Sequence, residues 1–240
     1  MGARAALVTG GSSGIGLAIA RMLGEEGFGV TLSARRPDKL EEAAEGLSSA
    51  GVEVEAVPAN MANEEEIVQL VARHRERFGR LDVLVNNAGV GIGSAIGEFA
   101  TKKLDMQIDV NLRAIVIATR ESVAMLKEAA AENGNAYLIN TASIAGKAGQ
   151  GWLSVYSATK FGVVGFTQAM HKELSNDGIK ATALCPGFVD TAMTDWVKGS
   201  VAAEEMIQPG DIAEAVRYLL KSSPGCIVPE IQFIRPGEGL

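Results

Sequence analysis

The sequence has 240 residues, of which 47% are hydrophobic and 21% charged, and its formal net charge is -7. A chain of this size and composition is typical of one α/β domain, and no break in composition divides it, so we expect a single domain over residues 1–240. The acidic balance argues against nucleic acid as a partner, because duplex-binding surfaces need clustered Lys and Arg.

The cysteines, histidines and apolar runs argue against a disulfide-rich protein, a metalloprotein and a membrane protein. The two cysteines, Cys185 and Cys226, are too few for a disulfide framework and suggest a reducing cytoplasm. The two histidines, His74 and His171, have no ligand-spaced partners, so no metal site is predicted. No apolar run reaches the ~18 residues of a membrane span, and no secretory segment opens the chain, so we expect a cytoplasmic protein without a membrane partner.

The first strand candidate, residues 5–8, runs into a glycine-rich loop and then a helical pattern. Strand, glycine loop and helix together present backbone N–H groups and a helix N-terminus to a phosphate. The spacing differs from G-x-G-x-x-G, and glycine turns are common, so the place of this loop at the first strand-to-helix turn carries the prediction. The residues expected to contact a cofactor here are Gly10, Ser12, Ser13, Gly14, Ile15 and Gly16.

The second strand candidate, residues 29–33, is followed by Arg35 and Arg36. In dinucleotide-binding folds a carboxylate at this tip accepts from a ribose 2′-hydroxyl, whereas arginine pairs with a 2′-phosphate. The pair therefore favours NADP(H) over NAD(H). The alternative is a solvated pair of surface arginines.

Five more strand candidates follow, at residues 52–57, 82–85, 136–140, 179–184 and 231–234, and helical patterns separate the strands. A helix is expected to begin at Asn63, with Glu66 completing a capping box, and another spans residues 104–126. The alternation predicts a Rossmann-type, doubly wound, seven-stranded parallel sheet with helices on both faces. Residues 190–209 have weak strand signals, and we expect them to form a mobile flap over a pocket, called the flap below.

Several polar residues stand where an open α/β sheet binds ligands. Asn86-Asn87-Ala88-Gly89 follows the fourth strand candidate, and Ser143 follows the fifth. Asn111 interrupts an apolar helical stripe, which is costly unless its amide is hydrogen-bonded, so it marks a structural bridge or a functional water.

Tyr156 and Lys160 are four residues apart, so both point the same way on a helix. An adjacent cation lowers the pKa of a phenol, which makes Tyr156 a candidate acid or base. The alternative is an ordinary amphipathic helix that carries both at its surface. The opposite face is small enough for another element to pack closely, through Ala158, Gly162, Gly165 and Ala169.

Taken together, these motifs resemble the short-chain dehydrogenases and reductases in their single-domain branch. The matching residues are Thr9-Gly10-x-x-x-Gly14-Ile15-Gly16, Asn86-Asn87-Ala88-Gly89, Asn111, Ser143, Tyr156-x-x-x-Lys160, and Pro186-Gly187 with Thr191. The resemblance implies an NADP(H)-dependent oxidoreductase that transfers a hydride between the nicotinamide and a small-molecule ketone, aldehyde or alcohol. It also implies a catalytic tetrad of Asn111, Ser143, Tyr156 and Lys160.

In the roles that the resemblance implies, Tyr156 donates the proton, Lys160 lowers the pKa of the phenol and holds the nicotinamide ribose, Ser143 orients the carbonyl oxygen, and Asn111 holds a water. Further cofactor contacts are expected at Asn60, Met61, Asn87, Ala88, Gly89, Tyr156, Lys160, Pro186, Gly187, Val189 and Thr191. The chain departs from the family where Asn60 replaces the usual aspartate after the third strand, and where Ser13 replaces a basic residue of some NADP-preferring members.

The substrate pocket is expected to contain Gln150, Trp152, Leu153, Met193 and Trp196, with residues 90–94. Aromatic and Met side chains suggest an apolar or partly apolar carbonyl compound, although core packing explains them about as well. From the family we expect a homodimer or homotetramer.

Three other functions fit parts of the pattern. A 3-oxoacyl carrier-protein reductase is weakened by a C-terminus that lacks the usual glycine-rich ending. A non-catalytic NADP(H)-binding sensor would tolerate erosion of the tetrad, and none is visible. A sugar-nucleotide epimerase needs a substrate domain, for which the chain after Thr191 is too short.

Overall fold

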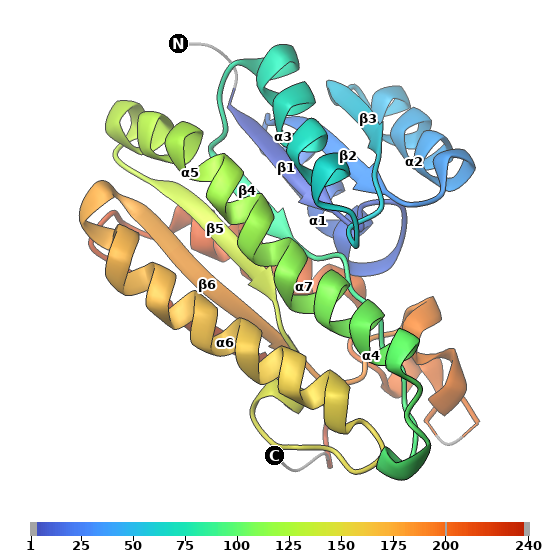
Figure 1. Ribbon diagram of the computed structural model, residues 1–240. Coiled ribbons are helices and arrows are strands. Elements are labelled where there is room, and N and C mark those ends of the chain that lie inside the picture. The colour runs from blue at the N-terminus through green and yellow to red at the C-terminus, as the bar shows by residue number, and fades with distance from the viewer. Residues whose placement is uncertain (1–3, 200, 238–240) are drawn as a thin grey trace.

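Seven parallel strands form one sheet in the computed structural model, which describes residues 4–199 and 201–237 (Figure 1). Their order across the sheet is β3-β2-β1-β4-β5-β6-β7. The strands are β1 (Ala5–Thr9), β2 (Gly29–Ala34), β3 (Val54–Pro58), β4 (Val83–Asn86), β5 (Ala136–Thr141), β6 (Ile179–Pro186) and β7 (Glu230–Phe233). The predicted doubly wound parallel sheet is confirmed, and each strand lies within two residues of its predicted bounds at either end.

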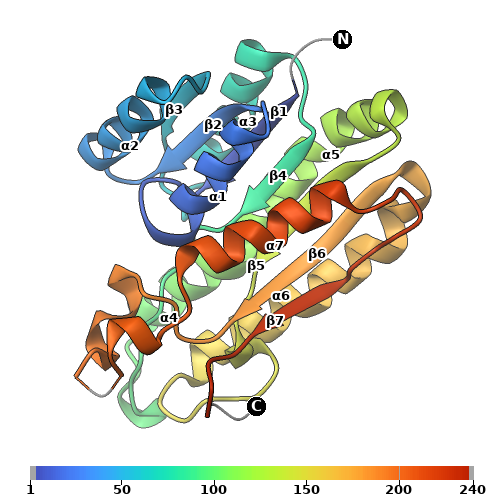
Figure 2. The ribbon, with the colours of Figure 1, turned by 180° about the vertical axis from the view of Figure 1, so that it is seen from behind.

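Helices cover both faces of the sheet. They are α1 (Gly14–Glu25), α2 (Pro37–Ser49), α3 (Glu64–Phe78), α4 (Thr101–Ile108), α5 (Ala114–Asn133), α6 (Ser154–Leu174) and α7 (Pro209–Lys221). Helices α3, α5 and α6 lie on the face seen in Figure 1, and α1, α2 and α7 on the face seen in Figure 2. Within the described ranges, no helix has the length and apolar character needed to cross a membrane.

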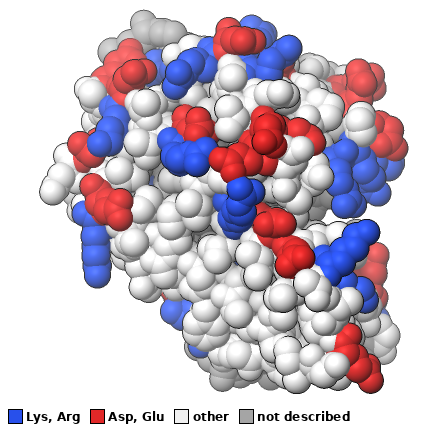
Figure 3. Space-filling view, viewed as in Figure 1, with Lys and Arg blue, Asp and Glu red and all other residues white. Residues whose placement is uncertain are grey.

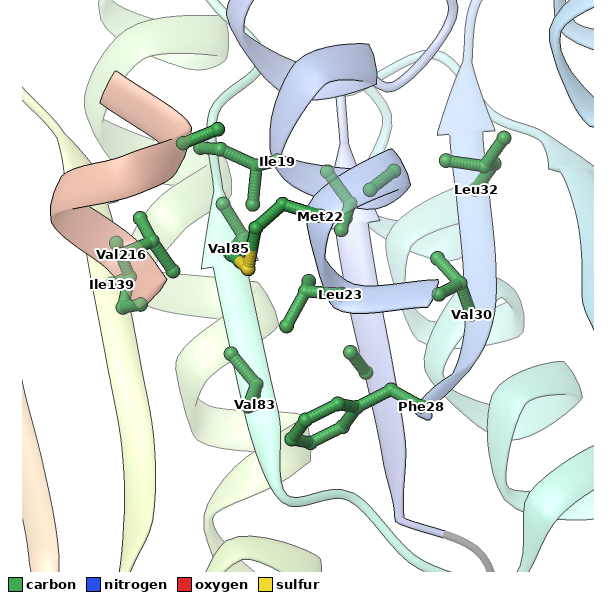
Figure 4. Packing of buried hydrophobic residues seen from close by; sticks show 14 of the residues in the cluster. Ile19, Met22, Leu23, Phe28, Val30, Leu32, Val83, Val85, Ile139 and Val216 are labelled. Carbon is green, nitrogen blue, oxygen red and sulfur yellow. The ribbon is translucent and has the colours of Figure 1, made fainter. Parts of the chain in front are cut away.

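The larger core lies between the sheet and the α1–α7 layer (Figure 4). Ile19 and Leu23 of α1 point toward Val83 and Val85 of β4, and all four are fully buried. Val216 of α7, a helix on the same face of the sheet as α1, packs in the same cluster. Each such side chain contributes about 1.5–3 kcal/mol by leaving water, so the α1–β1–β4 packing holds the glycine loop at its place on the sheet.

Helix α3 begins at Asn63 as predicted, but the predicted capping box is only half formed, because the Glu66 carboxylate accepts from the Asn60 backbone N–H at 2.7 Å and not from that of Asn63. The Asn63 side chain accepts a hydrogen bond from the Glu66 backbone N–H at 3.2 Å. Three acidic residues occupy the first turn and two arginines the last, an arrangement that complements the helix dipole. The helix stops at Gly79, whose φ of 69° is a left-handed conformation that favours glycine.

His74 of α3 is a buried cross-link to the sheet and predicts a pH dependence of stability. Its Nε2 donates to the Arg80 carbonyl oxygen at 2.8 Å, and its Nδ1 accepts from the Thr31 hydroxyl at 2.7 Å. Burial lowers the pKa of His74 from 6.5 to about 4. Between these values the unfolded chain binds a proton that the folded chain does not, so the free energy of unfolding falls by about 3 kcal/mol as the pH drops from 6.5 to 4.

Urea unfolding from pH 7 to pH 4 measures this loss. The His74→Gln variant is expected to lack it, while His171→Gln, which replaces the other histidine, is expected to keep the wild-type slope. Equal pH slopes in wild type and His74→Gln would show that this imidazole titrates normally.

Candidate active site

The predicted site residues meet at the carboxyl ends of the central strands. Strand β1 is followed by β2 and β3 on one side, and the chain then returns to place β4 on the other side. The helices that follow β1 and β4, α1 and α5, therefore lie on opposite faces of the sheet, and this reversal of strand order is the point at which α/β sheets bind nucleotides.

Ser143 and Tyr156 are hydrogen-bonded to each other. Ser143 follows β5, its hydroxyl accepts from the Ala145 N–H at 3.1 Å, and it donates to the Pro186 carbonyl oxygen at 3.3 Å. These contacts fix the serine between the ends of β5 and β6. Burial raises the pKa of Tyr156 above its usual 10.0, and the hydrogen bond with Ser143 opposes that rise. The phenol is therefore protonated at neutral pH and able to donate.

Lys160 lies one turn along α6 from Tyr156, as predicted, with its Nζ 5.6 Å from the centre of the phenol ring. Its side chain is 3% exposed, and Nζ donates to the Thr141 carbonyl oxygen at 2.8 Å. Burial lowers the pKa of Lys160 from 10.5 to about 8. The residue spacing predicts that Lys160 lowers the pKa of the phenol, whereas in the structure burial dominates and raises the pKa of Tyr156.

Asn111 lies in a π-helical turn, Asp109–Arg113, that joins α4 to α5. Its amide exchanges two hydrogen bonds with the Val90 backbone, at 2.8 Å and 2.9 Å, and donates a third to the Thr159 hydroxyl at 3.2 Å. Thr159 precedes Lys160 on α6. Asn111 is thus the structural bridge that its position in an apolar stripe indicates, and it joins the π turn, the loop after β4 and α6.

The glycines of the first loop, called the glycine cradle below, pack too closely against neighbouring residues to carry side chains. A Cβ on Gly16 would lie 2.3 Å from the Gly10 carbonyl oxygen, and one on Gly10 would lie 2.9 Å from Ala88 Cα. Gly10 and Gly14 have φ values of 66° and 56°, which favour glycine. A Cβ on Gly14 would lie 3.0 Å from Thr191 Cγ2, so the loops that the sequence assigns to one cofactor are neighbours.

Asn87 ties two of these loops together. Its side-chain amide donates to the carbonyl oxygens of Thr9 and Gly10, at 3.2 Å and 3.3 Å. The backbone N–H groups of Asn87 and Ala88 donate to the Thr9 hydroxyl, at 3.0 Å and 3.1 Å. Gly89 lies on the side of this junction that faces α6, because a Cβ there would lie 3.4 Å from Asn111 Oδ1 and 3.7 Å from Lys160 Nζ.

The residues predicted to read the adenosine end are more dispersed. Arg35 and Arg36 are exposed just beyond β2. Asn60 is exposed, and its side chain caps its own turn by accepting from the Ala62 N–H at 3.2 Å. Met61 is 7% exposed, and its side chain packs in the core with residues of α3. Any contact of Met61 with a cofactor would therefore come from its backbone groups.

The segment that leads into the flap leaves β6 beside Ser143. Pro186 ends β6, and Gly187 donates to the Phe233 carbonyl oxygen at 2.8 Å. Val189 is buried, and with Ile207 it forms a bridge that closes the flap on itself. Two short 3₁₀ turns, Ala192–Val197 and Ala203–Glu205, fill the segment.

The predicted pocket residues lie on two segments that flank Tyr156. Gln150 and Trp152 precede α6 and are exposed, and Leu153 caps the helix. Met193 and Trp196 project from the flap, 46% and 58% exposed. Trp152 and Trp196 meet across this gap with their ring centres 5.9 Å apart.

Sequence reasoning missed three partners of the site. Thr141 and Thr159 hold Lys160 and Asn111, and Gln107 accepts from the Ile92 N–H at 3.0 Å. Gln107 is fully buried one turn before Asn111. Its position four residues from Asn111 is the signal that could have found it, since both then face the same loop.

Comparison with known proteins identifies the family. The model of the short chain dehydrogenase family matches residues 4–200. The chain belongs to the short-chain dehydrogenases. This short-chain dehydrogenase is therefore an oxidoreductase, and the family resemblance read from the motifs is confirmed.

Individual relatives agree over nearly the whole chain. An uncharacterised oxidoreductase of Staphylococcus aureus is 38% identical over 233 residues, 97% of each chain. A provisionally named ketoacyl reductase of Streptomyces coelicolor is 38% identical over 98% of this dehydrogenase and 96% of its own length. The crystal structure of a variant of actinorhodin polyketide ketoreductase with NADPH superposes with a TM-score of 0.87 at 36% identity, covering 97% of each chain.

Proposed function

We propose that this protein is an NADP(H)-dependent oxidoreductase that interconverts a ketone or aldehyde with its alcohol, and that Tyr156 is the general acid. The observation that carries the proposal is the convergence of Ser143, Tyr156 and Lys160 at the ends of β5 and β6. A binding protein has no need of a buried lysine beside a phenol that is hydrogen-bonded to a serine.

The residues present fit a dinucleotide cofactor. Gly10, Gly14 and Gly16 let the loop pack against its neighbours where side chains would clash, and no side chain at these positions covers the N-terminus of α1, where a phosphate would bind. Arg35 would pair with a 2′-phosphate, and residues 186–191 would hold the carboxamide. When bound, the cofactor supplies or accepts the hydride. Support for NADP(H) also comes from the related ketoreductase, which is crystallised with NADPH.

The chain's own residues move the proton. The neutral phenol of Tyr156 donates to the substrate oxygen as negative charge develops there, and the Ser143 hydroxyl orients that oxygen by a hydrogen bond. Lys160 carries a buried positive charge below pH 8, which stabilises the phenolate left behind. Asn111 holds the loop after β4 against α6, so the position of this loop relative to Tyr156 is fixed.

The test is NADPH consumption by the purified protein against ketones, aldehydes, quinones and 3-oxoacyl thioesters, followed by NADP⁺ with alcohols. Turnover of any member supports the reductase. Tight NADPH binding with no turnover in either direction would assign the protein to the sensor class instead.

A second candidate substrate class is a 3-oxoacyl thioester. It is favoured by the 38% identity to the ketoacyl reductase of Streptomyces coelicolor. A thioester turned over at least tenfold more efficiently than the matching free ketone would select this candidate.

Arg35 gives a test of cofactor choice. We expect Arg35→Asp to lower the ratio of kcat/KM for NADPH to that for NADH by about 100-fold, because a charge-assisted hydrogen bond to the 2′-phosphate becomes a repulsion. The matched control is Arg21→Asp, an exposed arginine two turns into α1, which should leave the ratio unchanged. An unaltered ratio in Arg35→Asp would make Arg35 an ordinary surface charge.

We further propose a homo-oligomer formed through the α4–α5–α6 face. Ile108, Val116 and Phe161 are 40–46% exposed on these helices. In Figure 3 charged side chains gather over the upper half, and the lower half, over α6, is largely uncharged. Of the small residues predicted to receive another element, Gly162 packs on Leu112 within the chain, and Gly165 is open.

Light scattering at micromolar concentration tests this face. We expect the wild type to show a dimer or tetramer mass and Phe161→Asp to lower it, whereas Tyr218→Asp on α7 of the opposite layer leaves it unchanged. A monomer mass for the wild type would contradict the proposal.

A cytoplasmic location is proposed on the state of the thiols. Cys185 and Cys226 are both free. Burial raises the pKa of the Cys185 thiol to about 12, so it is unreactive filler in the core.

A further inference from the structure

An exposed cluster of aromatic rings stands beside the catalytic phenol. Trp152 and Trp196 are tilted by 55° with centres 5.9 Å apart, and Phe188 meets Trp196 edge-on at 6.1 Å. Trp152 and Trp196 are nonetheless 56% and 58% exposed. The three rings come from the loop before α6, from the flap and from the segment between β6 and the flap, and they are called the aromatic wall below. Large aromatic surfaces left open at a cleft are typical of a ligand contact.

Trp152 is held in a strained conformation. Its φ of 67° is the one positive φ of a non-glycine residue in the part of the chain that the structure describes. A bulky side chain there costs on the order of 1–3 kcal/mol, and such strain persists at sites where the surroundings impose it. The surroundings are specific: the Trp152 carbonyl accepts from the Ser94 N–H at 2.9 Å. The indole covers Gly93, where a Cβ would lie 2.2 Å from its ring.

The same loop links the aromatic wall to Tyr156. A Cβ on Gly91 would lie 3.8 Å from Met193 Sδ and 3.9 Å from Tyr156 Cε2, so Gly91 stands between the flap and the phenol. Gln107 fixes the position of this loop, because its side-chain oxygen accepts a hydrogen bond from the Ile92 N–H. A substrate whose oxygen reaches the phenol therefore has Gly91 and Met193 beside it, and the loop and flap that carry these two residues also contact or carry the aromatic wall.

The charges at the aromatic wall oppose an anionic substrate. Lys198 is the cation of the flap, and it is paired with Asp190 at 3.0 Å and Asp195 at 2.8 Å. Asp195 adjoins Trp196, so the rings are bordered by a neutralised lysine and two carboxylates. A neutral, flat ring gains most here, because stacking adds about 0.5–1.5 kcal/mol to the burial of apolar area.

We propose that the aromatic wall is a specificity site for ketones that carry an uncharged aromatic ring next to the carbonyl, and that Trp152 is its specificity-determining residue. The inference rests on the proposed reductase function and names its substrate class. Gly93 is part of the site, since any side chain there displaces the Trp152 ring.

The test compares acetophenone with cyclohexyl methyl ketone, which has a ring of similar size without aromaticity. Trp152→Ala should lower kcat/KM for acetophenone about threefold to tenfold more than for the cyclohexyl ketone, and Trp152→Phe should restore most of the loss. Gly93→Ala should act like Trp152→Ala. The matched control is Gly97→Ala, because a Cβ on Gly97 meets nothing within 4 Å.

A binding measurement separates this inference from the proposed function. The chain has two tryptophans, both in the aromatic wall, so intrinsic tryptophan emission reports on it alone. In the Tyr156→Phe variant with NADP⁺, acetophenone should quench this emission saturably and more tightly than the cyclohexyl ketone.

Equal losses for both ketones in Trp152→Ala, with turnover in the wild type, would overturn the inference and leave the reductase standing. Absent turnover of every ketone with saturable acetophenone binding would overturn the function and keep the site. Loss of oligomer mass in Trp152→Ala, without a change in ketone preference, would assign the aromatic wall to a subunit contact.

Discussion

Tyr156→Phe is expected to lower kcat for carbonyl reduction by about a thousandfold, within the range for removal of a general acid. The substitution deletes one oxygen atom. Ser143 keeps its hydrogen bonds to Ala145 and Pro186, so the ends of β5 and β6 stay in place. The loss therefore reflects the missing proton donor rather than a displaced loop.

NADPH titration separates the two effects. The dissociation constant for NADPH is expected to change little in Tyr156→Phe, because the glycine cradle and Arg35 are untouched. The matched control is Tyr218→Phe, the same chemical change on an exposed tyrosine of α7, which should keep full activity. Residual activity above about a tenth of wild type would mean that another group donates the proton.

The fold was predictable because its signals are local and repeated. Most strands are short apolar runs, and α3 begins and ends with recognisable residues, Asn63 and Gly79. In a parallel sheet covered on both faces such runs leave little ambiguity. The π turn at Asp109–Arg113 could not be predicted, since the apolar period of residues 104–126 passes through it. Asn111 was visible only as a polar residue in an apolar stripe.

The sequence predicted which residues form the site but not the direction in which the pKa values of Tyr156 and Lys160 are shifted. Residue spacing places Lys160 beside Tyr156 but says nothing of burial, which sets the direction of both pKa shifts. Trp152 was identified as a pocket residue, yet its left-handed backbone has no sequence signal, because glycine is the residue expected there. The contacts that impose it come from Ser94 and Gly93, nearly 60 residues away in the chain.

The buried charge of Lys160 leads to the second large effect, in which activity and stability change in opposite directions. Lys160→Met keeps the length of the side chain and removes the cation. We expect kcat/KM to fall by about a hundredfold to a thousandfold, because no positive charge then stabilises the phenolate. The free energy of unfolding without cofactor is expected to rise, because a pKa lowered from 10.5 to about 8 means that the folded state disfavours the ammonium by about 3 kcal/mol.

Two terms set the size of that rise. Methionine leaves the Thr141 carbonyl oxygen without its 2.8 Å donor, which costs about 1–3 kcal/mol and offsets part of the gain. The pH dependence isolates the charge. In the wild type the unfolded chain holds the Lys160 proton up to pH 10.5 and the folded chain only to about pH 8, so stability increases between these values.

Urea unfolding of the cofactor-free protein at pH 7 and pH 9.5 therefore decides the point. The advantage of Lys160→Met over wild type should be largest at pH 7 and shrink at pH 9.5, while Lys172→Met, an exposed lysine on the same helix, shows no such change. A constant difference between the two pH values would mean that the ammonium is fully solvated by the cleft. A shrinking difference would show that the fold bears the cost of a cation whose use is in the reaction, which is the pattern expected of a catalytic rather than a structural lysine.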